Sequence, residues 1–100
     1  MTRDELMRDV KNGIDDALQT NARYEIVPFW HAANRAFSLR VKVNHKIVTV
    51  PETLRMLSQE DAEQHAGGWG GAATERTRAI IEYLERQAKE PARRGVRRTV

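Results

Sequence analysis

Cysteine is absent from the 100-residue chain. This absence excludes a disulfide scaffold, a thiolate metal site and a cysteine nucleophile. Long apolar runs are missing as well, because the most apolar stretch, residues 26–33, is far too short to span a bilayer. No apolar segment follows the N-terminus in the way a secretory signal requires. We therefore expect a soluble, cytoplasmic protein that has no membrane partner.

Catalytic and metal-binding patterns are also scarce. The three histidines, His31, His45 and His65, match no spacing that would hold a metal ion. The two serines, Ser38 and Ser58, lie in an expected strand and an expected helix, and neither has the context of a nucleophile. We expect no catalysis, no cofactor and no metal. An enzyme site around His31 or His65 is the alternative left open.

What the chain does contain is charge, and the charge is unevenly distributed. Charged residues make up 31% of the chain and hydrophobic residues 40%, which is enough to build a core. The net charge is +3, yet residues 91–100 alone carry four arginines and no acidic residue. Residues 1–90 therefore sum to −1, and the high isoelectric point belongs mostly to the C-terminal end.

The N-terminal segment has a helical pattern. Thr2 and Glu5 have the spacing of a capping box, and apolar residues then recur at helical intervals. Gly13 is the weak point, because a glycine inside a helix costs about 1 kcal/mol relative to alanine. The pattern predicts one helix over residues 3–19 with a possible break at residues 12–13.

Three strands are expected next. Residues 24–30 are rich in aromatic and β-branched side chains, and Pro28 favours an edge strand or a bulge. Residues 37–43 alternate strictly between apolar and polar, and residues 46–50 form a third strand. A two-residue turn at Asn44–His45 would pair Val43 with Lys46, which sets the register of this hairpin.

Helical patterns return in the second half of the chain. We expect a short helix after Pro51, a glycine-rich loop over residues 66–71 and a last helix over residues 75–89 that Pro91 ends. The fold class is then α+β, with a three-stranded antiparallel meander and helices packed on one face. We expect a domain over residues 1–90 and a flexible basic tail over residues 91–100.

Two sets of residues are candidates for binding. The first, for protein contacts, comprises aromatic side chains of the first strand and of the glycine-rich loop: Tyr24, Phe29, Trp30 and Trp69. Apolar residues on both sides of that strand indicate either that helices wrap around it or that a second chain covers it. The second set, for nucleic acid, is basic: Arg40, Lys42, Arg93, Arg94, Arg97 and Arg98.

The stretch from Phe37 to Leu57 combines a strand, a turn containing asparagine, a second strand and a Pro51–Glu52 helix start. It resembles small proteobacterial proteins of unknown function in which a β-hairpin feeds a helix. The resemblance implies a bacterial protein and assigns no functional residue. The expected function is a non-catalytic interaction module that binds an unknown protein partner or a second copy of itself. Weak, sequence-nonspecific nucleic-acid binding is the alternative.

Overall fold

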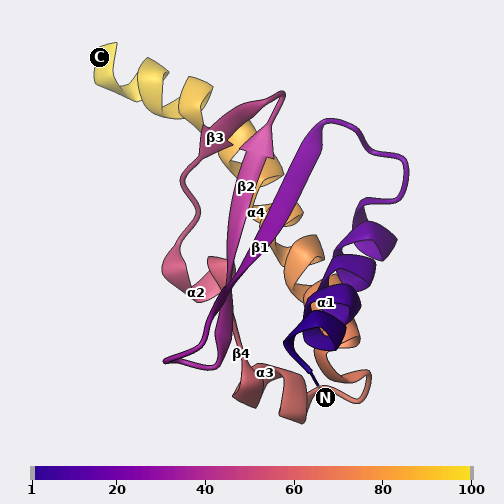
Figure 1. Cartoon of the computed structure of the whole chain (residues 1–100). Coiled ribbons are helices and arrows are strands. Elements are labelled where there is room, and N and C mark those ends of the chain that lie inside the picture. The colour runs from indigo at the N-terminus through magenta and orange to yellow at the C-terminus, as the bar shows by residue number, and fades with distance from the viewer. Residues whose placement is uncertain (1, 100) are drawn as a thin grey trace.

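The computed structural model describes the backbone of residues 2–99 and the side chains of residues 2–88 (Figure 1). It is an α+β fold in which helices cover one face of an antiparallel sheet. The elements in chain order are α1 (Arg3–Leu18), β1 (Tyr24–His31), β2 (Ala36–Val43), β3 (Lys46–Val48), α2 (Glu52–Arg55), β4 (Met56–Ser58), α3 (Gln59–Gln64) and α4 (Gly68–Thr99).

The sheet confirms the expected meander and adds one strand to it. β1, β2 and β3 follow one another in space, and the short β4 pairs with the N-terminal half of β2 on the side that β3 occupies further along. The predicted hairpin register is also confirmed, because Val43 pairs with Lys46 and Val41 with Val48. Asn44 and His45 both have positive φ, 51° and 69°, as a two-residue type I′ turn requires.

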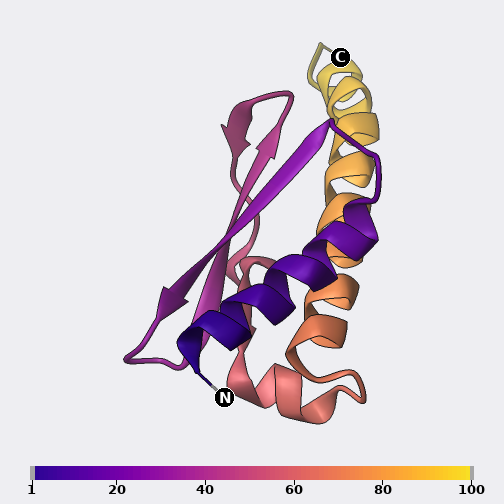
Figure 2. The same cartoon turned by 45° about the vertical axis from the view of Figure 1, so that its right-hand side comes forward.

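Two layers enclose the core. α1 and α4 lie together on one face of the sheet and leave the other face uncovered (Figure 2). The inward side chains of β1, β2 and β4 meet apolar residues of both helices. Those of the core that are almost completely buried are Val10, Ile14, Phe37, Leu39, Val41, Leu57, Ala73 and Ile80.

α1 begins with the predicted capping box between Thr2 and Glu5, and it continues without a break through Gly13. The glycine is needed because α4 crosses α1 at this position. A Cβ on residue 13 would overlap the carbonyl oxygen of Gly70, and the Thr74 hydroxyl donates a 2.8 Å hydrogen bond to the Gly13 carbonyl. Close helix packing therefore offsets the low helix propensity of this residue.

The expected glycine-rich loop is wrong over most of its length. α4 starts at Gly68, so Trp69, Gly70 and Gly71 lie in its first turns. Small residues are required here because a side chain on Gly70 or Gly71 would press on α1 or on the His65 ring. Tertiary packing has overridden the sequence preference of these glycines for a loop.

α4 also continues past its expected end at residue 89 and past Pro91, as far as Thr99. A proline inside a helix removes one backbone hydrogen bond but keeps a helical φ, so a helix can continue through it. The side chains of residues 89–100 lie outside the described part of the structure. The predicted flexibility of residues 91–100 therefore stays a prediction.

The middle helix is shorter than expected and is divided. Met56, Leu57 and Ser58 form β4, and the Leu57 side chain is completely buried on the side of the sheet that faces the helices. Ser58 then caps α3 through a capping box with Asp61, so a new helix begins where the strand ends. Among the described residues, no helix has the length and apolar character of a membrane span.

Candidate interaction surface

The uncovered side of the sheet, here called the outer face, is the main candidate for a contact surface. The strand register determines its members, because directly paired residues point to the same side. Phe29 pairs with Ser38, Lys42 with Ile47, and Ser38 with Met56. The outer face is formed by Glu25, Val27, Phe29, Ser38, Arg40, Lys42, Ile47 and Met56.

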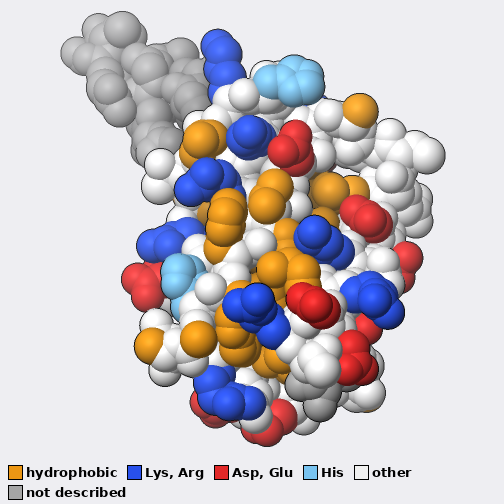
Figure 3. Space-filling model, viewed as in Figure 1, with side chains coloured by type: hydrophobic (Ala, Val, Ile, Leu, Met, Phe, Trp, Pro, Cys, Tyr) orange, Lys and Arg blue, Asp and Glu red, His pale blue; other side chains and the backbone are white. Residues whose placement is uncertain are grey.

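Two large hydrophobic side chains are exposed on the outer face. Phe29 exposes 41% of its surface and Ile47 exposes 65%. Val27 and Met56 beside them are half-buried, and Figure 3 shows hydrophobic side chains gathered in the middle of this side with basic side chains among them. A face in which apolar groups are surrounded by polar ones is typical of a surface that contacts another molecule.

Basic groups border these apolar side chains. The Arg40 guanidinium lies over the Phe29 ring, 4.7 Å from its centroid, in a cation–π contact. Lys42 lies 4.0 Å from the Glu25 carboxylate. The outer face thus brings together Arg40 and Lys42, both proposed from sequence for nucleic-acid contact. The other four arginines of that set, Arg93, Arg94, Arg97 and Arg98, lie outside the described side chains.

Most of the aromatic residues proposed for protein contact pack within the domain. Trp30, Phe37 and Trp69 form a cluster whose ring centroids are 4.9 to 6.2 Å apart, and Tyr24 is only 6% exposed. The cluster joins the sheet to the first turn of α4. Of the four proposed residues, Phe29 alone lies on the outer face.

Sequence reasoning did not select Ile47, although it is the most exposed large hydrophobic residue among those described. The hairpin register could have indicated this residue, because it places Ile47 on the same side of the sheet as Arg40 and Lys42. An isoleucine on an otherwise polar sheet face is the feature that could have identified it.

A groove runs beside β2, with a volume of about 370 Å³. It lies where β2 passes from its pairing with β4 to its pairing with β3, and the chain from Thr49 to Arg55 closes its other side. We call it the β2–α2 groove. Its polar lining comes from Ser38, Arg40, Thr49 and Arg55.

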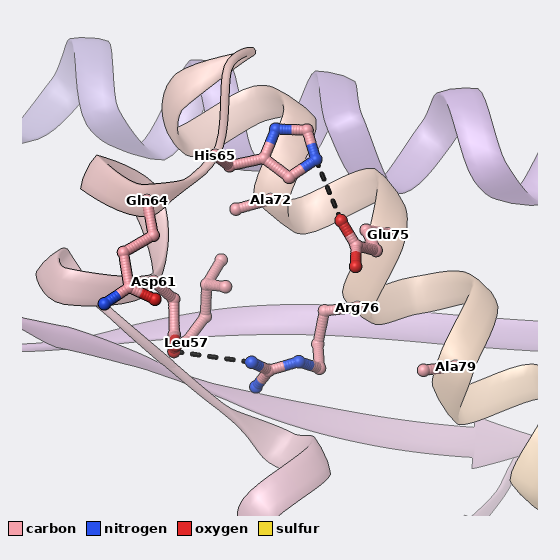
Figure 4. A pocket seen from close by; sticks show the side chains of 8 residues that line it. All are labelled: Leu57, Asp61, Gln64, His65, Ala72, Glu75, Arg76 and Ala79. Atoms are coloured by element: carbon pink, nitrogen blue, oxygen red, sulfur yellow. Dashed lines mark ion pairs between the residues drawn. The ribbon is translucent and has the colours of Figure 1, made fainter.

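A second polar hollow, of about 280 Å³, lies between α3 and α4 around His65 (Figure 4). His65 Nδ1 accepts a 3.0 Å hydrogen bond from the Gly67 N–H, so the neutral ring carries its proton on Nε2. Nε2 in turn lies 2.9 Å from Glu75 Oε2. Both ring nitrogens are therefore occupied, and the pair serves to hold the start of α4 against α3.

On the other wall of this hollow, Arg76 connects three elements. Its guanidinium lies 3.3 Å from Asp61 and donates to the backbone carbonyls of Leu54 and Met56. Partial burial raises the pKa of Asp61, but hydrogen bonds from Ser58 and the charge of Arg76 outweigh that effect. The pKa of Asp61 is therefore held below its usual value.

A third hollow, of about 590 Å³, is more apolar and lies between the hairpin end of the sheet and α4. Tyr24, Val43, Val48 and Leu84 line it. Ala88, the last residue whose side chain the structure describes, also lines the hollow, and we assign no ligand to it.

No family model, curated protein or solved structure shows a significant match to the chain. The resemblance of residues 37–57 to small proteobacterial proteins therefore stays a prediction.

Proposed function

We propose that the protein is a small interaction module without catalytic chemistry, and that it contacts another protein chain through the outer face of its sheet. One observation carries this proposal. Phe29 and Ile47 are exposed on a sheet face that no helix covers, while the other aromatic side chains of β1 pack inside. Burying these side chains against a partner would remove apolar surface from water, which favours association.

A second copy of the chain is the simplest partner. In such a dimer, two outer faces would meet and bring Arg40 and Lys42 of both copies close together. Like charges at an interface oppose association, and salt screens them. Self-association through this face should therefore strengthen as salt is added.

Light scattering after size-exclusion chromatography tests this proposal. We expect the mass of two chains at high micromolar concentration, a larger dimer fraction at high salt, and the mass of one chain for Ile47→Lys. Thr20→Lys is the matched control, because it adds the same charge at an exposed position outside the outer face. A wild-type chain that stays monomeric at every salt concentration would rule out the dimer.

Nucleic-acid binding is the second candidate, favoured by the presence of Arg40 and Lys42 on the same face as the exposed ring of Phe29. Basic groups beside an aromatic ring can contact phosphates and stack a base. Phosphate contacts by the four tail arginines alone would make log K fall with log salt with a slope of about −3.5. Fluorescence anisotropy with a random oligonucleotide measures that slope.

The two candidates respond to salt in opposite directions, which separates them. Removing residues 91–100 should abolish oligonucleotide binding and leave self-association unchanged. An intact chain that fails to bind the oligonucleotide at low salt would end the second candidate.

A further inference from the structure

The β2–α2 groove exists because the sheet has a gap beside β2. β3 pairs with residues 41–43 of β2, and β4 pairs with residues 36–38. Leu39 and Arg40 lie between the two ladders and have no partner strand on this side. The segment from Thr49 to Arg55 passes around the gap and turns it into a groove.

The backbone of Leu39 faces this groove. The residues that flank a two-residue hairpin turn, here Val43 and Lys46, form a hydrogen-bonded pair. Along a strand, the backbone N–H and C=O groups of successive residues point alternately toward one neighbouring strand and the other. Those of Val41 and Leu39 therefore point to the same edge of β2 as those of Val43, which is the edge that β3 occupies. Pro28, opposite Leu39, agrees with this, because its ring nitrogen then points to the free edge of β1.

Two arginines, Arg40 and Arg55, line the same groove. The stacking of Arg40 on Phe29 restricts the side chain but leaves its in-plane N–H groups available. Arg55 is half-buried on the opposite wall. Neither arginine forms an ion pair among the described side chains, whereas Arg76 and Arg86 do, and no carboxylate lines the groove.

We propose that the β2–α2 groove binds the phosphate group of a small ligand. Arg40 and Arg55 match the two negative charges of a phosphomonoester, and planar guanidinium groups suit phosphate oxygens. The hydroxyls of Ser38 and Thr49 and the N–H of Leu39 add donors around the same space. The volume of about 370 Å³ falls within the range of small-molecule sites. This site is complete within one chain, but it shares Ser38 and Arg40 with the outer face that the proposed dimer would bury.

Nuclear magnetic resonance titration with inorganic phosphate tests the proposal on the full chain. Sodium chloride at matched ionic strength is the reference. We expect saturable shifts of the Leu39 amide and of the side-chain Nε–H signals of Arg40 and Arg55. Arg40→Gln and Arg55→Gln should each weaken binding by about tenfold or more. Arg78→Gln, which removes an exposed arginine of α4 outside the groove, should leave binding unchanged.

Phe29→Leu provides a further readout, because it keeps an apolar side chain but removes the ring under Arg40. It should weaken phosphate binding less than Arg40→Gln does. Equal shifts with chloride and phosphate, or equal losses in the Arg78 and Arg55 variants, would overturn the proposal.

Titrations with a nucleoside monophosphate and with an oligonucleotide show which kind of phosphate compound the groove binds. Tighter binding of a nucleoside monophosphate than of inorganic phosphate would assign the groove to a nucleotide, and equal binding would assign it to phosphate itself. Binding of an oligonucleotide without a terminal phosphate, together with no binding of inorganic phosphate or of the nucleoside monophosphate, would overturn the proposal in favour of the nucleic-acid candidate.

Discussion

At the scale of single residues, the described side chains include one buried hydroxyl that has no hydrogen-bond partner. Thr77 is completely buried in α4, and its Oγ1 has no hydrogen-bond partner in the described part of the chain. Replacing such a group with an apolar one of the same shape removes the cost of burying it. Thr77→Val should therefore raise the free energy of unfolding by about 1 kcal/mol, measured by urea denaturation. Thr77→Ser, which keeps the hydroxyl and loses a methyl group, should lower it.

Gly13 leads to the opposite expectation. Alanine is the better helix former, by about 1 kcal/mol, so Gly13→Ala should stabilise an isolated α1. In the folded chain the added methyl group would collide with the Gly70 carbonyl, and overpacking of this kind costs about 1–3 kcal/mol. We expect a net loss of stability in thermal unfolding, whereas Asn12→Ala on the exposed side of α1 should cause none. A more stable Gly13→Ala variant would show that α1 and α4 are not in close contact.

At the scale of elements, we expect the stability of the α3 N-terminus to depend on pH. Hydrogen bonds from Ser58 and the charge of Arg76 keep the pKa of Asp61 low, so Asp61 stabilises the fold above the unfolded-state pKa of about 4. That contribution is lost as the pH falls through the lower folded-state pKa. Asp61→Asn should cost about 1 kcal/mol at neutral pH and reduce the loss of stability in acid. Denaturation across that pH range checks this.

Asp16→Asn is the matched control for the Asp61 variant, because it removes the same charge from an exposed position on α1. It should leave both the stability at neutral pH and its acid dependence nearly unchanged. Equal pH profiles for the two variants would contradict the assignment to the α3 cap.

The sequence predicted elements well where local signals decide the structure and poorly where packing does. The capping box at Thr2, the alternation in β2 and the turn at Asn44 are local, and all three features are present. The start of α4 contains glycines because α1 and His65 pack closely against it. A pattern in a single sequence does not reveal such contacts between distant elements. β4 is only three residues long, which is too short to show the alternation of a strand. Its apolar residue, Leu57, therefore also fitted a helical pattern.

At the scale of the whole molecule, the layered arrangement was predictable, but the role of the aromatic residues was not. The hairpin register placed Arg40, Lys42 and Ile47 on one face, as observed. The aromatic residues of β1 and Trp69 are distributed by three-dimensional packing, which places Trp30 and Trp69 together and leaves Phe29 outside. The β2–α2 groove required the position of Arg55 relative to β2, which only the fold reveals.

The division between a domain and a basic tail is a property of the whole chain, and it leads to the last prediction. Every almost completely buried residue among those described lies at or before Ile80, and α4 extends beyond the end of the sheet (Figure 1). Deleting residues 91–100 should therefore change the free energy of unfolding by no more than about 0.5 kcal/mol. Trp30 and Trp69 belong to the core cluster, so their fluorescence during urea denaturation reports on the body of the fold. A loss well above that limit would show that residues 91–100 pack on the domain.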